Sequence, residues 1–343
     1  ARQGGSGIDD PRPTAMKPQG EQVVDCGSKT IQDAHHFAHE AMATVFEIYI
    51  TDDDETYARQ GAQAAFAEVD RLELEMSRFI SNSDISRLND AVPGEIVDFG
   101  MDVFECLSRA RDMYDKTSGA FDISVGALYS CWLNDDRTLR QPSDEELARA
   151  CELTGLDHLK LSDEDFSAEV LTEGVQFDLG GIGKGYAAEK MAEILREWSL
   201  GQALVLAGAS SVLSVSVPEG MTGWPIKLRH PGNREDVLAR FELTEGAISG
   251  SGKQKGQHII DARSVEGVPV EGRVAAWAMA PDAVAADALS TAFMLLSAEE
   301  IDDYCLANPG TAAIIVPHVG SEKSSGRVVE SFGQGRGLNS PLR

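Results

Sequence analysis

The sequence has little positive charge: 30 Lys and Arg residues stand against 56 Asp and Glu residues, which gives a formal net charge of −26. Because such a surface repels nucleic-acid phosphates and anionic membranes, we expect no nucleic acid as a partner. Long hydrophobic runs are also absent, since no stretch approaches the ~20 apolar residues of a membrane-spanning helix. With 42% hydrophobic and 25% charged residues, the chain has the composition of a soluble globular protein without a membrane span.

Cysteine is also scarce. The five cysteines are far apart and form no C-x-x-C pair (Cys26, Cys106, Cys131, Cys151 and Cys305). An odd, dispersed set argues against a disulfide framework and against a zinc ribbon. The chain begins at Ala1 with neither Met nor a signal peptide. We expect an exported protein, periplasmic or anchored to a membrane through a leader that has been removed.

The length of 343 residues suits one large domain or two fused lobes. Residues 1–34 are rich in Gly, Pro, Asp and Gln and lack hydrophobic periodicity, which predicts a mobile arm. Residues 319–343 predict a similar tail, in which residues 327–332 could add a short strand. Residues 35–318 contain no low-complexity linker and no repeat, so we expect them to form a single domain.

Hydrophobic periodicity predicts a mixture of helices and strands. Apolar residues at helical spacing predict helices at residues 56–79, 102–119, 143–155, 185–201 and 282–297. Runs rich in β-branched and aromatic residues predict strands at 42–50, 203–208, 211–217, 224–230, 239–249, 273–280 and 311–318. Because these elements do not alternate strictly, the order favours an α+β fold over a doubly wound parallel sheet.

Residues 177–190 read FDLGGIGKGYAAEK, a glycine-rich stretch between a short apolar run and a predicted helix. A Walker loop is excluded because Asp178 replaces its first glycine and Gly185 replaces its Ser or Thr. A dinucleotide fingerprint that begins at Gly181 fails at Tyr186. The glycines still permit close backbone approach to a ligand, and the helix start would present free N–H groups to an anion. A plain strand-to-helix turn is the alternative.

An acidic residue lies within an otherwise apolar predicted helix, since residues 283–295 read AVAADALSTAFML. Asp287 shares one helix face with Ser290 and Thr291, which follow three and four residues later. A carboxylate buried there without a partner would be costly, and a cation would offset that cost. Carboxylate, hydroxyl and carbonyl oxygens form a hard ligand set that suits magnesium. A basic side chain paired with Asp287, or a solvated helix face, is the alternative.

Two groups of histidines are candidates for chemistry. His36 and His39, with His35 beside them, have metal-like spacing, but no cysteine or further histidine lies nearby, so we prefer a solvated or capping role. His258 opens a short apolar strand, and Asp261 follows three residues later. A histidine near an acid can shuttle protons or be held by a hydrogen bond, and the pattern alone favours the second role.

Six segments, in order over about residues 42 to 300, together resemble the ApbE family of flavin transferases. They read MATVFEI, SRFISNSDISRLND, SGAFDISVGAL, DLGGIGKGYAAEK, HIIDAR and ADALSTAFMLL. The fourth is similar to the family's Asp-Leu-Gly-Gly-x-Ala-Lys-Gly-Tyr-Ala motif, with Gly183 in place of Ala, and the third has Ser124 in place of Thr. Collinear segments of this kind are far more specific than a single glycine loop.

The resemblance implies a fold and a reaction. The fold would be a mixed, largely antiparallel sheet packed with helices, T-fold-like, with a FAD cleft between two lobes. The reaction would be magnesium-dependent transfer of FMN from FAD to a Thr or Ser hydroxyl of an acceptor flavoprotein subunit, with release of AMP. FAD and Mg²⁺ are therefore the expected ligands.

The resemblance also implies roles for residues at matching positions. FAD contacts are implied for Met42, Phe79, Ala120, Phe121, Asp122, Gly180, Lys184, Tyr186 and Ile260. A magnesium site is implied at the backbone oxygen of Gly183 with Asp287 and Thr291, to which Ser290 could add an oxygen. His258 and Asp287 are the implied catalytic residues, with His258 assisting proton transfer or stabilising charge.

Three short segments depart from the family pattern. Ala209 and Ser210 stand where the family has the second Gly and the Asp of Gly-Gly-Asp. Ile248 and Gly252 replace the Thr and the Tyr of Thr-Ser-Gly-x-Tyr, and residues 261–267 read DARSVEG instead of Asp-Pro-Arg-Thr-Gly. The alternatives to FMN transfer are therefore a FAD-binding protein for storage or sensing, or one that hydrolyses FAD. Bulk composition alone would also allow an acidic interaction domain without a cofactor.

Overall fold

The computed structural model describes residues 24–25, 34–52, 54–134, 138–252, 259–264, 272–318 and 329–333. Its centre is an eight-stranded sheet in the order β14-β13-β12-β11-β8-β7-β3-β2, with antiparallel neighbours throughout. Its strands are β2 (His35–Ala41), β3 (Thr44–Ile50), β7 (Ala203–Ala207), β8 (Ser211–Ser214), β11 (Gly246–Gly252), β12 (Arg273–Ala280), β13 (Ala312–Pro317) and β14 (Glu330–Gly333). This sheet, combined with helices, confirms the predicted α+β class.

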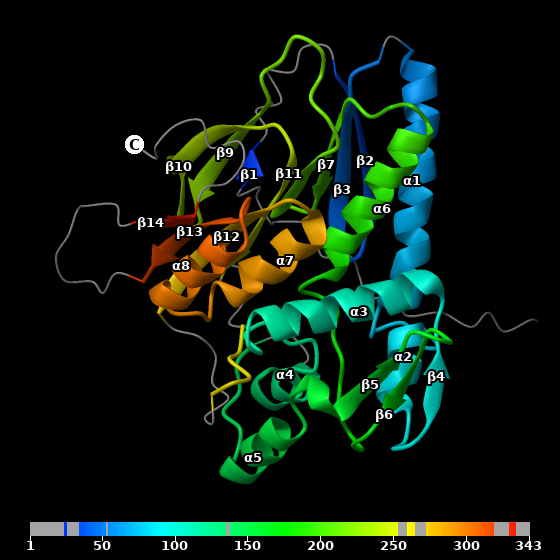
Figure 1. Ribbon diagram of the computed structural model, residues 1–343, viewed down its shortest axis with the longest axis vertical. Coiled ribbons are helices and arrows are strands. Elements are labelled where there is room, and N and C mark those ends of the chain that lie inside the picture. Colours follow the sequence, from blue (N-terminus) through cyan, green and yellow to red (C-terminus); the bar gives the residue numbers. More distant parts are fainter. Residues whose placement is uncertain are drawn as a thin grey trace, which may run out of the picture.

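Helices cover one face of this sheet (Figure 1). The long helices α1 (Glu55–Met76) and α6 (Gly183–Glu197) lie side by side, blue and green in the figure. Helix α7 (Ala283–Ala292) packs on β11 and β12 and also contacts α6. Helix α8 (Ala298–Ala307) follows it and packs near β13 and β14.

The two faces of the large sheet carry separate hydrophobic cores. On the helical face, Phe46 of β3 is buried with residues such as Leu72 of α1 and Met191 of α6. On the other face, Trp224 and Phe241 come from a second sheet of order β1-β9-β10. Its strands are β1 (Val24–Asp25), β9 (Trp224–His230) and β10 (Asn233–Leu243). Because both faces are covered, the central strand β7 is apolar throughout and all five of its residues are buried.

A second lobe lies at one end of these layers (Figure 1). Helix α3 (Met101–Lys116) runs along the boundary and contacts both α1 and α7. The lobe also holds α2 (Asp84–Asp90), α4 (Gly126–Trp132), α5 (Asp144–Glu152) and a three-stranded sheet of β4 (Ile96–Asp98), β6 (Ser167–Val170) and β5 (Leu159–Ser162). The glycine loop leaves this lobe after β6 and enters α6, so it lies where the two lobes meet.

Some element boundaries differ from the sequence prediction. The strand expected at residues 239–249 is two strands, β10 and β11, because the chain turns before Gly246, which adopts a left-handed φ of 81°. The helix expected to run to residue 297 ends at Ala292, and α8 begins after a Ser297 cap. Strand β2 has no counterpart in the prediction, since its HHFAHEA sequence contains few strong strand formers.

The predicted arm and tail each contribute one short strand. Strand β1 pairs with β9, and β14 forms at the strand expected in residues 327–332 and pairs with β13. Residues 1–23, 26–33, 319–328 and 334–343 lie outside the described residues. In the part of the chain that the structure describes, no helix combines the length and apolar character needed to cross a membrane.

Candidate active site

The glycine loop makes a tight turn before the first turn of α6. Asp178 Oδ1 accepts the Gly180 N–H at 2.7 Å, and the N–H groups of Ile182 and Gly183 both donate to the Leu179 carbonyl. Helix α6 then begins at Gly183, and its N-cap residue, Ile182, makes no side-chain capping bond. A helix start carries partial positive charge, so it suits an anionic ligand.

Helices α6 and α7 approach each other closely at Gly185. A Cβ atom there would lie 2.3 Å from the Ala283 carbonyl oxygen, so only glycine fits. This approach places the Gly185 N–H 3.1 Å from Asp287 Oδ2, across 102 residues of sequence. The Lys184 ammonium lies 3.4 Å from the same oxygen and donates to the Gly180 carbonyl at 2.8 Å. The structure thus joins the glycine loop to the acid on the distant helix.

The second carboxylate oxygen of Asp287 faces the large sheet. Asp287 is buried, with 4% of its surface exposed. Its Oδ1 accepts the Ser249 hydroxyl at 3.0 Å, and the Ser211 hydroxyl lies 3.5 Å away. Ser211 and Ser249 are 2.7 Å apart on the paired strands β8 and β11. Both carboxylate oxygens therefore have hydrogen-bond donors, which offsets the cost of burying the charge.

Three hydroxyl groups gather one turn further along α7. Ser290 is fully buried and donates to the Asp287 carbonyl oxygen at 2.8 Å. Ser251 Oγ lies 2.8 Å from Ser290 Oγ and 3.2 Å from Thr291 Oγ1. Asp287, Ser290 and Thr291 thus lie together on one helix face, as their spacing predicts. The Ser290 hydroxyl donates its proton to the helix backbone.

Asp287, Ser290 and Thr291 carry the carboxylate and hydroxyl oxygens that magnesium prefers as ligands. Within the described residues, no three His, Cys, Asp or Glu side chains gather as a metal centre. Magnesium sites at nucleotide phosphates commonly use one or two carboxylates and complete their shell with phosphate oxygens. The Lys184 ammonium pairs with Asp287 Oδ2 at 3.4 Å, which is the alternative that the sequence left open. Magnesium binding through Asp287, Thr291 and the Gly183 carbonyl stays a prediction.

The segment at residues 120–122 meets the glycine loop beside α7. A Cβ atom on Gly181 would lie 3.1 Å from Phe121 Cε2 and 3.4 Å from Thr291 Oγ1, so the three residues are in contact range. Ala120 and Phe121 are buried, and burial raises the pKa of the neighbouring Asp122 carboxyl. Phe121, one of the three predicted FAD contacts in this segment, therefore lies at the same junction as Thr291.

Phe79 lies next to the glycine loop with an exposed ring. The ring is 72% exposed, and the Arg78 guanidinium lies 5.2 Å from its centroid. Arg78 Nη1 is 3.3 Å from Asp178 Oδ2, an ion pair without hydrogen-bond geometry. An exposed aromatic face beside the loop is available to stack on a planar ligand. Met42, by contrast, occupies the β2–β3 turn in a left-handed conformation with φ of 49°.

Two predicted FAD contacts are buried in packing interactions. The Tyr186 hydroxyl lies 2.9 Å from Asp102 Oδ1 and 2.7 Å from Glu105 Oε2, both on α3, and these two acceptors share its single proton. Burial and these two carboxylates raise the pKa of Tyr186. The Tyr186 hydroxyl connects α6 to α3 through these contacts. Ile260 is buried in a small cluster with residues of α4 and α5. His258 lies outside the described residues, and its catalytic role stays a prediction.

The histidines of β2 lie on the edge strand of the large sheet. The His35 ring is 2.9 Å from the Asp52 carbonyl oxygen. The rings of His36 and His39 are each 2.7 Å from one carboxylate oxygen, on Glu47 and Asp70 respectively. Each ring therefore has its own partner in this part of the structure, and none shares a partner with another histidine.

Three serines of the site are missing from the sequence prediction. Ser211, Ser249 and Ser251 lie in the two segments, GASS and ISGSG, that depart from the family pattern. The available signal was the strand period of two, which places Ser249 and Ser251 on the same face of β11. Ile248 lies on the opposite face of β11 and is buried in the other core with Trp224. The departure at position 248 therefore does not contact Asp287.

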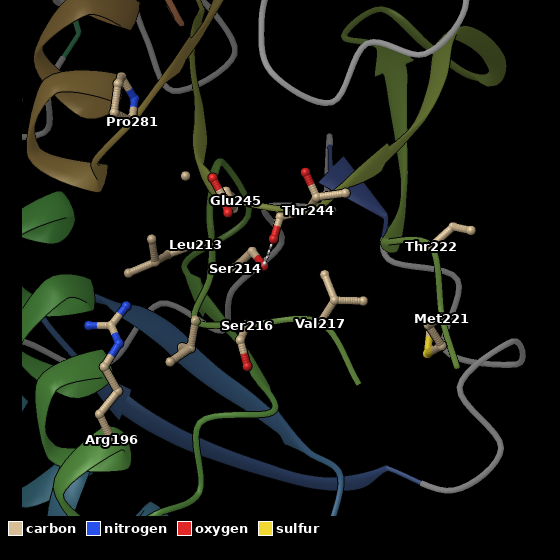
Figure 2. Close-up of a pocket in the computed structure, with 12 residues that line it drawn as sticks. Arg196, Leu213, Ser214, Ser216, Val217, Met221, Thr222, Thr244, Glu245 and Pro281 are labelled. Carbon is tan, nitrogen blue, oxygen red and sulfur yellow. Dashed lines mark hydrogen bonds between the residues drawn. The ribbon is translucent and has the colours of Figure 1, made fainter. Parts of the chain in front are cut away.

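A separate hollow of about 560 Å³ opens at the C-terminal end of α6. Figure 2 shows Arg196 of α6 beside it and Ser214 of β8, whose hydroxyl donates to the Thr244 carbonyl at 3.1 Å. None of the predicted site residues lines this hollow. Because α6 has 15 residues, its two ends are about 20 Å apart, and this hollow is distinct from the candidate active site.

Comparisons with known proteins agree with this geometry. The sequence model of the ApbE family matches residues 42–315. A FAD:protein FMN transferase of Klebsiella pneumoniae is 25% identical over 273 residues, which cover 76% of this chain and 77% of that protein. A FAD:protein FMN transferase of Salmonella typhimurium is 26% identical over 279 residues, covering 76% and 78%.

Solved structures extend the comparison to the fold. The crystal structure of an ApbE protein from Thermotoga maritima is 28% identical and has a TM-score of 0.76, covering 87% of this chain and 97% of that one. The flavin transferase ApbE from Vibrio cholerae, 21% identical with a TM-score of 0.74, has the same fold and the same 87% coverage of this chain. Because the family match spans most of the sequence and includes the glycine loop and Asp287, the chain belongs to the ApbE family.

Proposed function

We propose that the protein transfers FMN from FAD to a Thr or Ser hydroxyl of an acceptor flavoprotein, with magnesium as cofactor and AMP as second product. The observation that carries the proposal is the meeting of the α6 start, the Lys184 ammonium and the buried Asp287 carboxylate. Membership of the ApbE family supports it, since relatives in Klebsiella and Salmonella are named FAD:protein FMN transferases.

The reaction exchanges the phosphoanhydride bond of FAD for a phosphoester bond to the acceptor. The acceptor hydroxyl oxygen attacks the phosphorus of the FMN half of FAD, and the bond from that phosphorus to the bridging oxygen breaks. AMP leaves with the bridging oxygen, and the acceptor hydroxyl loses its proton. Attack by water in place of the hydroxyl would release free FMN and AMP.

The chain's own groups are suited to holding the FAD diphosphate. The partial positive charge at the start of α6 and the Lys184 ammonium attract the negatively charged oxygens of the diphosphate. Gly180 and Gly181 allow the diphosphate to come close to the backbone. When bound by Asp287, Thr291 and the Gly183 carbonyl, magnesium would neutralise diphosphate charge and polarise the phosphorus under attack.

Binding of the flavin ring and acceptance of the released proton require further groups. The exposed Phe79 ring provides a surface on which the flavin can stack, and buried Phe121 supports the glycine loop from below. His258 is the proposed proton acceptor, because an imidazole titrates near neutral pH. The nearby Asp261 is engaged by the Arg263 side chain, with oxygen–nitrogen distances of 3.1 Å.

The Asp287→Ala variant tests the proposal. The wild-type protein, mixed with FAD, magnesium and an acceptor that carries a Ser/Thr-Gly-Ala-Thr-type sequence, should yield a fluorescent flavin-labelled acceptor. Asp287→Ala should lower the rate by about 100-fold or more, since the cation supplies several kcal/mol of stabilisation. Asp303→Ala, an exposed acid on α8, is the matched control and should transfer normally.

Two results would contradict the proposal. Transfer by Asp287→Ala that still depends on magnesium would place the cation elsewhere. Wild-type protein that binds FAD and magnesium but labels no acceptor would favour storage or hydrolysis, and free FMN in the mixture would identify hydrolysis.

A further inference from the structure

Two chains of hydroxyl groups run from the large sheet to the acid-bearing helix α7. Ser249 and Ser251 lie on one face of β11, which packs against α7, and Ser211 pairs with Ser249 in register across β8. Ser249 and Ser211 are 1% and 3% exposed, so their hydroxyl protons must find partners within the protein. The number of protons that each group carries therefore determines the direction of each hydrogen bond.

The first chain ends on the Asp287 carboxylate. A carboxylate accepts hydrogen bonds and has no proton to give, so the Ser249 hydroxyl must donate to Asp287 Oδ1 across 3.0 Å. Because Ser249 has one proton, Ser211 donates across the 2.7 Å contact to Ser249, which is much shorter than the 3.5 Å contact from Ser211 to Asp287 Oδ1. This order fixes Oδ1 toward the sheet and directs Oδ2 toward Gly185 and Lys184.

The second chain ends on the Asp287 backbone. Ser290 donates its proton to the Asp287 carbonyl oxygen at 2.8 Å, so Ser251 must donate across the 2.8 Å contact to Ser290 Oγ. Ser251 then has only lone pairs left for Thr291, whose hydroxyl must donate across 3.2 Å. The proton of Thr291 is thereby turned toward the sheet, and the remaining lone pairs of Thr291 Oγ1 are free to bind a cation.

We propose that Ser249 and Ser251 are positioning residues that orient Asp287 and Thr291 as cation ligands, with Ser211 completing the first chain. The proposal rests on the proposed function, because it assumes that Asp287 and Thr291 hold the magnesium ion of the FMN transfer reaction. In this arrangement Ser290 accepts a hydrogen bond from Ser251 and donates one to the helix backbone, so it connects Ser251 to α7. Partners that orient metal ligands in this way typically contribute about 10- to 100-fold to metal affinity.

The test measures divalent cation binding directly. Manganese, a paramagnetic substitute for magnesium, is titrated into the full chain with FAD present, and free Mn²⁺ is followed by electron paramagnetic resonance. Ser249→Ala and Ser251→Ala should each weaken Mn²⁺ binding by about 10- to 100-fold. Ser214→Ala is the matched control, because this buried serine of β8 bonds to the Thr244 carbonyl and should bind Mn²⁺ as the wild type does.

A second pair of variants separates positioning from loss of packing. Ser251→Thr and Ser251→Val have nearly the same shape and differ in one hydroxyl group. Ser251→Thr should keep Mn²⁺ affinity within about threefold of the wild type, and Ser251→Val should show the full loss. Thermal unfolding of each variant without metal shows whether the fold is intact.

The outcomes distinguish this inference from the proposed function. If the wild type binds Mn²⁺ with FAD while Ser249→Ala, Ser251→Ala and Ser251→Val bind it equally well, the positioning role is overturned and the proposed function stands. If the wild type with FAD binds no divalent cation, the proposed magnesium chemistry fails and the positioning role fails with it.

Discussion

Alanine in place of Gly185 should disturb the active site. Alanine in place of Gly183, two residues earlier in the same helical turn, should not. A Cβ atom on Gly185 would lie 2.3 Å from the Ala283 carbonyl oxygen. Since ordinary contacts begin near 3.4 Å, α7 must move away from α6 by about 1 Å. On Gly183, the nearest atom would be Leu179 Cβ at 3.8 Å, an ordinary contact.

The expected magnitudes follow from this geometry. Overpacking of a close contact costs about 1–3 kcal/mol of unfolding free energy, and alanine regains about 1 kcal/mol as the better helix former. Gly185→Ala should therefore lower the unfolding free energy by up to about 2 kcal/mol, and Gly183→Ala should leave it unchanged or raise it by up to about 1 kcal/mol. Because the same displacement moves Asp287, the transfer rate of Gly185→Ala should fall by about 100-fold.

Two assays are needed to separate stability from activity. Urea denaturation followed by circular dichroism gives the unfolding free energies, and initial rates at saturating FAD and magnesium give the transfer activity. If Gly185→Ala is as stable and as active as Gly183→Ala, the close approach of α6 to α7 does not position Asp287, and the reasoning is refuted.

Three further substitutions have distinct expected results. Burial raises the pKa of Asp122, so the free energy of unfolding falls as pH rises above about 4 and this carboxyl ionises. Asp122→Asn should reduce this fall, measured by urea denaturation from about pH 4 to 7. Phe79→Ala should weaken FAD binding by about 3- to 10-fold in a fluorescence titration, with stability unchanged because the ring is exposed. Tyr186→Phe should lower the unfolding free energy by about 1.5–3 kcal/mol, because Asp102 and Glu105 lose a hydrogen bond, while the KM for FAD stays unchanged.

The sequence predicts the strongly patterned elements well. Strand β12 matches residues 273–280, and β9 matches residues 224–230, since continuous apolar or alternating patterns specify strands directly. The edge strand β2 and the short helices α2 and α4 do not follow from their sequences. Their formation depends on pairing with β3 and on packing within the second lobe, which local propensity does not encode.

Likewise, only the local features of the candidate site could be predicted from the sequence. The i, i+3, i+4 spacing correctly places Asp287, Ser290 and Thr291 on one helix face, because helical geometry is local. The closeness of Gly185 to Asp287 requires the packing of two helices, and spacing alone gives no sign of it. The hydroxyls of Ser211 and Ser249 meet only after two strands pair in register, so the sequence alone does not show that they lie together.

The most direct test of FMN transfer is the intact mass of an acceptor protein after incubation with FAD and magnesium, with AMP measured in the same mixture. The proposed function predicts that the acceptor gains the mass of one FMN less one water, that one AMP appears for each modified acceptor, and that a chelator prevents both. An acceptor of unchanged mass in the presence of protein-bound FAD and magnesium would contradict it.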